Sequence, residues 1–168
     1  MEMKILSHSE LIRLILCIAV CQMAGAIGSL FTASSVGTWY ADLSKPWFSP
    51  PGWVISAVWI SLFTLMGISL FLVWRRAPAG REQQANKKIA LLVFAIQLLV
   101  NAGWSWAFFG LQSPPAGLAV IMVLWLLILL TIWRFWLISR TAAWMLLPYL
   151  LWVSFAAFLN YSFWRLNP

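Results

Sequence analysis

The chain has 168 residues, of which 63% are hydrophobic and only 9% are charged. Because a soluble domain is about 25% charged, this composition excludes an ordinary water-soluble protein and predicts a single membrane domain over residues 1–168. The 11 Lys and Arg residues outnumber the 4 Asp and Glu residues, but they stand between long apolar runs, as topology signals do, and no nucleic acid partner is expected.

Apolar stretches in the chain are long enough to cross the hydrocarbon core of a bilayer, which needs roughly 20 helical residues. The five predicted spans are 11–33, 52–74, 88–109, 116–138 and 142–164. The links after the third and fourth spans are short, which makes neighbouring helices antiparallel and adjacent. The sequence therefore predicts an all-α membrane protein, a bundle of five transmembrane helices.

The connections between the predicted spans differ in character. Residues 34–51 form the longest expected loop, because their Ser, Gly and Pro residues disfavour a helix. This loop also carries aromatic residues, and we expect it to fold back over the bundle. Residues 75–87 are polar and predict a solvated turn.

Positive charges gather on one side of the predicted bundle. Nine lie in or near the N-terminal segment, the second connection and the fourth, with Arg13 and Arg134 inside spans but within about two turns of their ends; these nine are Lys4, Arg13, Arg75, Arg76, Arg81, Lys87, Lys88, Arg134 and Arg140. The other side has only Lys45 and Arg165. Because cytoplasmic loops are enriched in Lys and Arg, this bias predicts an integral multi-pass protein with a cytoplasmic N-terminus.

The sequence offers few groups for acid–base or metal chemistry. Its acids are Glu2, Glu10, Asp42 and Glu82, its one histidine is His8, and none lies within a predicted span. Paired carboxylates, metal-ligand clusters and an intramembrane proton relay are therefore not predicted. Neither a metal nor a cofactor is expected.

Tryptophan is unusually frequent, with 13 copies. Those near the helix ends on the N-terminal side, such as Trp74 and Trp136, are typical of the aromatic belt at a membrane interface. A second set gathers toward the opposite side, namely Trp39, Trp47, Trp53, Trp59, Trp104, Trp106 and Trp164. Indole has a large flat apolar face and one N–H donor, so several such rings around a cavity would suit a flat polycyclic ligand. Both interpretations of these tryptophans, an interfacial belt and the lining of a ligand cavity, remain open.

The third predicted helix carries Gln97, Asn101 and Ser105 on one face, which should point into the bundle. Interhelical hydrogen bonds and ligand contact both explain this stripe. The fifth predicted helix should be kinked at Pro148. Its broad inner face comprises Tyr149, Trp152, Ala156, Asn160 and Phe163.

The end of the fifth predicted helix contains Leu159, Tyr161 and Arg165. These residues satisfy a loose pattern proposed for cholesterol contact. An aromatic helix end with a snorkelling arginine explains the same residues.

Three signatures follow one another along the chain. The first is WYADLSKP at 39–46 with PPGW at 50–53, the second is NAGWSW at 101–106 with FFG at 108–110, and the third is PYLLW at 148–152 with LNY at 159–161 and WR at 164–165. In these segments, and from about residue 25 to its end, the chain resembles the TspO/MBR family. That family comprises tryptophan-rich sensory proteins in bacteria and the translocator protein, or peripheral-type benzodiazepine receptor, in mitochondria.

The resemblance implies a homodimer in a membrane, expected to be the bacterial cell membrane. It also implies binding of porphyrins such as protoporphyrin IX or haem, of sterol-like lipids, and of synthetic isoquinoline or benzodiazepine ligands. The small-residue pairs Ala24/Gly28 and Gly25/Ser29 would permit close helix approach, either between chains or within one.

The resemblance also implies roles for particular residues. Trp53 and Trp152 match two tryptophans linked to porphyrin breakdown, and are the candidate catalytic residues. The expected ligand-binding set is Trp39, Pro51, Trp53, Gln97, Asn101, Trp104, Tyr149, Trp152, Ala156 and Asn160. Ala116 stands where the animal proteins place a ligand-contacting tryptophan, and this departure from the family pattern leaves the affinity for the animal protein's drug ligands open.

Three functions remain open. The first is a receptor or sensor for tetrapyrroles and lipids, the second is an enzyme that degrades protoporphyrin with light and oxygen, and the third is a porphyrin or lipid transporter. The presence of aromatic residues and the lack of ionisable catalytic groups favour binding, while the lack of internal repeats disfavours a carrier. We expect one cavity beneath the 34–51 loop, lined by Trp53, Gln97, Asn101, Trp104, Trp152 and Ala156.

Overall fold

The computed structural model describes residues 7–168, and within them the chain is helical, with no strand. Its elements are α1 (His8–Val36), α2 (Trp39–Asp42), α3 (Gly52–Trp74), α4 (Arg81–Ser105), the π-helical turn η1 (Trp106–Gly110), α5 (Pro114–Trp136), α6 (Arg140–Met145) and α7 (Leu147–Leu166). Five segments, with α4–η1 and α6–α7 each taken as one, are long and apolar enough to cross a membrane. The predicted five-helix bundle is confirmed.

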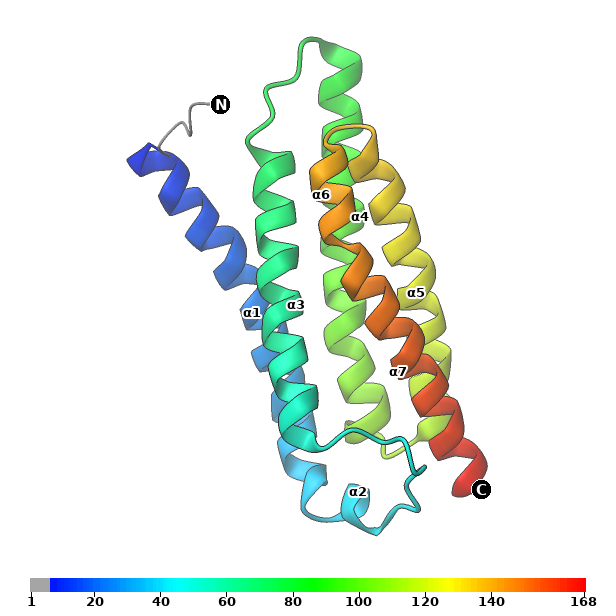
Figure 1. The fold of residues 1–168 in the computed structure, drawn as a ribbon. Helices are drawn as coiled ribbons and strands as arrows, with labels where there is room; N and C mark the ends of the chain where they lie inside the picture. The colour runs from blue at the N-terminus through cyan, green and yellow to red at the C-terminus, as the bar shows by residue number, and fades with distance from the viewer. Residues whose placement is uncertain (1–6) are drawn as a thin grey trace.

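The helices run side by side, and the short α2 lies at the end of the bundle opposite the N-terminus (Figure 1). α1 packs on α3 and α4, α4 packs on α5, and α5 packs on α7. A Cβ atom at Gly67 would lie 2.5 Å from the Ile18 Cα, so only glycine permits the close crossing of α1 and α3. Cβ atoms at Gly25 and Gly28 would meet Phe63 and Ser105 of the same chain. These two small residues are therefore used for packing within the bundle.

The helix α1 extends further than the sequence suggested. Ser34 and Ser35, which were expected to begin a loop, belong to its last turn. The Ser34 hydroxyl donates to the Phe31 carbonyl oxygen (2.8 Å), and the Ser35 hydroxyl donates to the Phe109 carbonyl oxygen of η1 (2.8 Å). Because both hydroxyls find carbonyl partners, the serines continue the helix instead of ending it.

The solvated turn expected at 75–87 is confined to the residues before Arg81, where α4 begins. The Gln83 side chain accepts a hydrogen bond from the Ala79 backbone N–H (2.8 Å) and thereby closes the start of this helix. Lys87 donates to the carbonyl oxygens of Trp74 (2.6 Å), the last residue of α3, and of Arg76 (2.8 Å), two residues beyond it. These polar residues therefore stabilise helix ends.

The fifth span is interrupted as expected near its proline. α6 ends at Met145 and α7 begins at Leu147, one residue before Pro148. Proline has no N–H to donate to the preceding turn and its ring crowds that turn. The break changes the direction of α7 relative to α6. The far end of α7 reaches the loop that follows α2.

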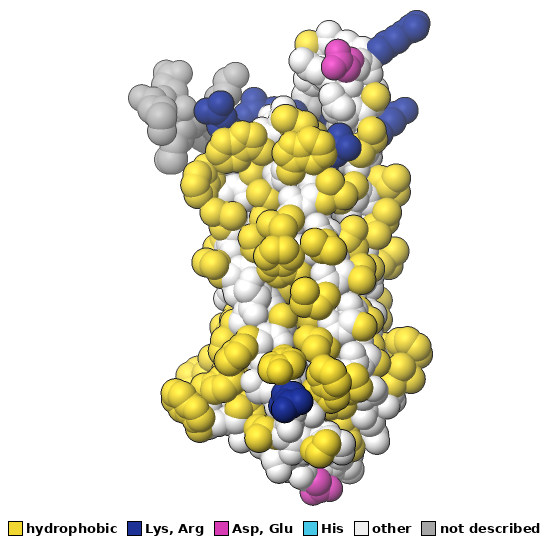
Figure 2. Space-filling model, turned by 90° about the vertical axis from the view of Figure 1, so that its right-hand side faces the viewer, with side chains coloured by type: hydrophobic (Ala, Val, Ile, Leu, Met, Phe, Trp, Pro, Cys, Tyr) yellow, Lys and Arg dark blue, Asp and Glu magenta, His cyan; other side chains and the backbone are white. Residues whose placement is uncertain are grey.

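Charged side chains occupy the two ends of the molecule, and hydrophobic side chains cover most of the face between them (Figure 2). Lys4 lies outside the described residues, and the other eight residues of the predicted positive set lie near the end that carries α1's first turn. Arg13, Arg134 and Arg140 there lie over the rings of Trp74, Trp133 and Trp136, respectively, with 4.5–5.8 Å between the guanidinium carbon and the ring centroid. This pairing of cations with exposed indoles is typical of a membrane interface. The side of the membrane that this end faces stays a prediction.

Candidate ligand-binding cavity

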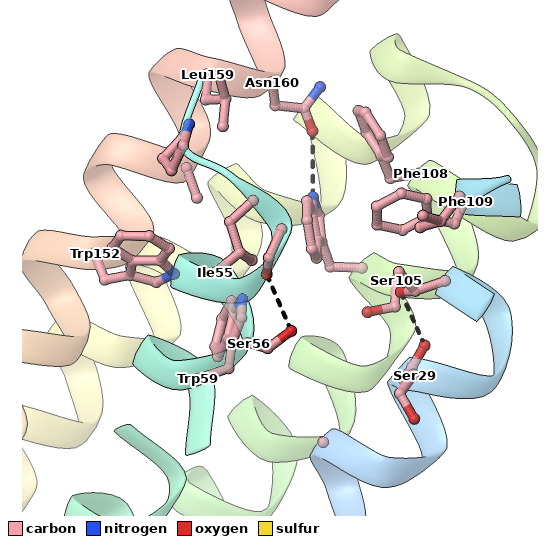
Figure 3. A pocket seen from close by; sticks show the side chains of 18 of the residues that line it. Ser29, Ile55, Ser56, Trp59, Ser105, Phe108, Phe109, Trp152, Leu159 and Asn160 are labelled. Carbon is pink, nitrogen blue, oxygen red and sulfur yellow. Dashed lines mark hydrogen bonds between the residues drawn. The ribbon is translucent and has the colours of Figure 1, made fainter. Parts of the chain in front are cut away.

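A cavity of about 1060 Å³ lies between α1, α3, α4, η1 and α7, at the end of the bundle that carries α2. Figure 3 shows side chains from these helices around a common space. The labelled residues are Ser29 of α1, Ile55, Ser56 and Trp59 of α3, Ser105, Phe108 and Phe109 of α4 and η1, and Trp152, Leu159 and Asn160 of α7. Pockets for drug-sized molecules are usually about 300–1,000 Å³, so this cavity is large enough for a bulky ligand.

The loop after α2, residues 43–51, covers the cavity and forms its roof. Pro46, Pro50 and Pro51 of this roof are among the lining residues of the cavity. Aromatic contacts hold this roof: the Phe48 ring stacks on Phe158 of α7, with 5.2 Å between the centroids. Asn167, beyond the end of α7, accepts a hydrogen bond from the Ser44 N–H (2.9 Å) and donates one to the Ser44 carbonyl oxygen (3.1 Å). The loop thus folds back over the bundle, as its aromatic content predicted.

α3 turns one narrow face to the cavity. Gly52, Ile55, Ser56 and Trp59 line it at the spacing of successive helical turns. Trp53 is not among the lining residues, and it is 75% exposed. A step of one residue turns a side chain by about 100° around a helix, so the position that follows Gly52 points outward. The expectation that Trp53 lines this cavity is not met.

α4 contributes Asn101, Trp104 and Ser105 to the lining, whereas Gln97 lies one turn deeper and outside it. The Asn101 side-chain amide donates to the Tyr149 hydroxyl (2.8 Å), which donates to the Gln97 side-chain oxygen (3.0 Å). Gln97 and Tyr149 are both about 1% exposed and lie behind Asn101. The polar stripe therefore points inward as predicted, but only part of it reaches the cavity, and Gln97 and Tyr149 hold Asn101 in place.

The π-helical turn η1 ends the third span beside the cavity. Its wider backbone ring is closed by the Leu111 N–H, which donates to the Trp106 carbonyl oxygen (2.9 Å). Two consecutive aromatic side chains of this turn, Phe108 and Phe109, both line the cavity. Trp39 packs against Phe108, with 5.7 Å between the ring centroids, and is not itself among the lining residues.

α7 provides Trp152, Phe155, Ala156, Leu159 and Asn160. The Asn160 side-chain oxygen accepts from the Trp104 indole N–H (3.2 Å), and its amide donates to the Pro114 carbonyl oxygen (2.7 Å). The indole nitrogen of Trp152 is buried and has no hydrogen-bond partner among the described residues. An unsatisfied buried donor costs about 1–3 kcal/mol, so a ligand with an acceptor at this position would gain by meeting it.

The residues of the loose cholesterol pattern do not share one site. Leu159 lines the cavity, but Tyr161 and Arg165 do not. Tyr161 is 44% exposed, and its ring lies 6.2 Å from that of Trp164 on the outside of the bundle.

Several lining residues were not selected from the sequence. Tyr40 and Lys45 stand within the first signature, and Ser29 and Thr32 belong to the small and polar face of α1. The signature at 39–46 contains Tyr40 and Lys45, so it could have indicated both residues. The face of α1 was interpreted only as a surface for helix packing.

The chemistry that the cavity offers is that of binding. The described lining residues include no Asp, Glu, His or Cys, and Lys45 is the one charged residue among them. Within residues 7–168, no group of three or more His, Cys, Asp or Glu side chains is placed to hold a metal ion. Aromatic faces and a few hydrogen-bonding groups are what a bound molecule would meet.

Comparison with known proteins gives consistent matches along the chain. A model of the TspO/MBR family matches residues 17–165. The chain is 42% identical to the tryptophan-rich protein TspO of Chlorobaculum tepidum over 161 residues, which cover 96% of this chain and 99% of that protein. It is 40% identical to the protein of the same name from Archaeoglobus fulgidus, over 94% of this chain and 99% of that protein. It is also 31% identical to the translocator protein of Bos taurus, over 86% and 84% of the two chains. These matches include every helix that surrounds the cavity.

Proposed function

Because the chain belongs to the TspO/MBR family, we propose that this integral multi-pass membrane protein is a receptor or sensor that binds a tetrapyrrole, such as protoporphyrin IX or haem, in the cavity beneath the α2 loop. The observation that carries the proposal is the cavity of about 1060 Å³ lined by indole and phenyl rings. Sterol-like lipids and synthetic isoquinoline or benzodiazepine ligands are further candidates for the same space.

The physical basis is burial of a flat apolar surface. Each Å² of apolar area removed from water stabilises a complex by about 25 cal/mol, before the costs of ordering the partners. Trp59, Trp104 and Trp152 present rings to the ligand from three different helices. The Trp152 indole N–H adds one donor that the described residues leave unpartnered.

The test is titration of the purified protein in lipid nanodiscs with protoporphyrin IX, followed by tryptophan quenching and porphyrin absorbance. Ala156→Phe places a ring in the cavity and should weaken binding by at least tenfold, or about 1.4 kcal/mol. Ala19→Phe is the matched control, because Ala19 is exposed on α1 and lines neither this cavity nor the groove between α4 and α5. Equal binding by the two variants, or no binding by the wild type, would contradict the proposal.

Light-dependent porphyrin breakdown is the second candidate, and the position of Trp152 in the cavity lining favours it. Trp53 lies outside that lining, so a ligand in the cavity would contact Trp152 alone of the two predicted catalytic residues. In illuminated, aerated samples, Trp152→Phe should abolish any breakdown and Trp53→Phe should retain it. Loss of breakdown in Trp53→Phe alone would place the reaction outside the cavity.

We also propose a homodimer with cytoplasmic N-termini. Family membership supports the dimer, and the charge bias supports the orientation. Gly25 and Gly28 pack inside the chain, so the interface would use another surface. Light scattering in mild detergent tests the dimer, and reporter fusions after Pro78 and after Pro115 should report opposite sides of the membrane.

A further inference from the structure

Among the described residues that line the cavity, Lys45 is the one with a charged side chain. It follows Ser44, whose backbone N–H donates to the Asn167 side-chain oxygen and whose carbonyl oxygen accepts from the Asn167 amide, beyond the end of α7. The roof therefore presents Lys45 at a defined place relative to the helix that carries Trp152 and Ala156.

The Lys45 ammonium lies over an aromatic ring rather than beside a carboxylate. Its nitrogen is 4.9 Å from the centroid of the Tyr40 ring, which also lines the cavity. Within residues 7–168, the ion pair found joins Arg75 and Glu10, at the opposite end of the molecule. The charge of Lys45 thus has no anionic partner among the described residues.

The Tyr40 ring is itself well supported. Its centroid lies 5.4 Å from those of Phe109 and Phe163. Burial raises the pKa of the Tyr40 phenol above its ordinary value, so the phenol stays neutral at physiological pH. The ring attracts the ammonium through its quadrupole but does not neutralise it, which leaves the full positive charge for a ligand.

We propose that Lys45 is a carboxylate-binding residue that selects ligands with a broad apolar body and one or more carboxylates at a single edge. This inference rests on the proposed function and deepens it, because it distinguishes carboxylated porphyrins from neutral esters and sterols. The apolar ring enters among Trp104, Trp152 and Phe155, and its acidic edge stays at the roof beside Lys45. Charge-assisted hydrogen bonds from an ammonium to a carboxylate are stronger than neutral ones.

The same geometry fixes the direction in which such a ligand binds. The lining residues furthest from the loop include Gln22, Phe63 and Asn101. The hydrogen-bonded pair of Gln97 and Tyr149 lies behind Asn101. No cation is present among these groups to meet a carboxylate, and burying an unpaired charge is very costly. A carboxylated ligand therefore enters with its acidic edge outward.

The experiment compares protoporphyrin IX with its dimethyl ester, each titrated into wild type and variants in nanodiscs of zwitterionic lipid. Lys45→Gln should weaken binding of the diacid about fivefold and change ester binding less than twofold. Lys45→Arg should keep most of the diacid affinity, and added salt should reduce the effect of Lys45→Gln. Lys88→Gln removes the same charge from an exposed site at the other end of the bundle and should leave both affinities unchanged.

The outcomes test the carboxylate-binding role of Lys45 separately from the proposed porphyrin binding. No binding of either porphyrin to the wild type overturns the proposed function, and the role of Lys45 with it. Binding of both porphyrins, with Lys45→Gln weakening them equally, overturns the carboxylate role alone and makes Lys45 a packing residue of the roof. Equal losses of diacid binding in Lys45→Gln and Lys88→Gln also overturn it, because they would show a general effect of net charge.

Discussion

The two halves of the bundle are packed in different ways. In the half near the N-terminus, the rings of Phe94 and Phe135 stack with 5.6 Å between their centroids, and Met66, Val73 and Ile128 are fully buried. In the half near α2, helices of the same kind surround a cavity of about 1060 Å³. The closed half has the dense packing of an ordinary protein interior, whereas the open half leaves aromatic surface for another molecule to cover.

Hydrophobic residues therefore contribute mainly to stability in the closed half and to ligand contact in the open half. Removing a side chain from the closed half opens a void, which costs stability. Removing one from the wall of the open half enlarges a space that already exists and should cost chiefly ligand affinity. Matched substitutions in the two halves test this distinction.

The largest expected effect comes from the pair Phe135→Ala and Phe155→Ala. Phe135 is fully buried, so its loss should lower the free energy of unfolding by about 3–5 kcal/mol. Phe155 is half-buried and lines the cavity, so its loss should cost less stability and weaken porphyrin binding more. Chemical unfolding in detergent and porphyrin titration measure the two quantities, and the reverse order of stabilities would refute the division into halves.

An intermediate effect is expected at the boundary between the halves, where Tyr149 joins Gln97 and Asn101. Tyr149→Phe leaves both amide side chains without the shared hydroxyl. An unsatisfied buried polar group costs about 1–3 kcal/mol, and the freed Asn101 should also reduce porphyrin affinity.

Tyr161→Phe serves as the control for this variant. Tyr161 is exposed on α7, and surface substitutions usually change stability by less than about 0.5 kcal/mol. Identical unfolding curves for Tyr149→Phe and Tyr161→Phe would show that the buried hydrogen-bond chain contributes nothing.

The smallest effect is expected from Asn167→Ala, which removes the two hydrogen bonds that fix the roof to α7. These bonds are exposed to solvent, so the loss of stability should be about 1 kcal/mol or less. A looser roof should let porphyrin leave faster, which stopped-flow fluorescence measures as a rise in the dissociation rate. Asn86→Ala, at the opposite end of the bundle, should leave this rate unchanged, and equal rates in the two variants would contradict the role of the roof.

The sequence predicted the helices well because hydropathy over a long segment depends little on detail. It failed where single contacts decide a helix end. Ser34 and Ser35 continue α1 because their hydroxyls find carbonyl partners. The residues after Arg81 are helical, and Lys87 among them also closes the end of α3. The partner of Ser35 in η1 and those of Lys87 at the end of α3 belong to other elements, so the local pattern does not reveal them.

The candidate site was predicted in part for a related reason. Trp104, Trp152 and Ala156 could be placed from helix direction alone. The prediction that Trp53 lines the cavity was wrong because Trp53 follows the lining residue Gly52, and one residue turns a side chain by about 100° around the helix. Lys45 was not selected although the loop was expected to cover the cavity, since a loop has no periodicity that assigns a direction to its side chains.

The central claim is that the porphyrin occupies the open half of the bundle. Paramagnetic relaxation tests it most directly, with manganese(III) protoporphyrin added to protein whose Ile, Leu and Val methyl groups are labelled for NMR. Methyl signals of Ile55 and Leu159, which line the cavity, should broaden first, while those of Val73 and Ile128 in the closed half persist. Strongest broadening at Leu99 and Val123, in the apolar groove between α4 and α5, would show that the porphyrin binds outside the cavity and would contradict the account.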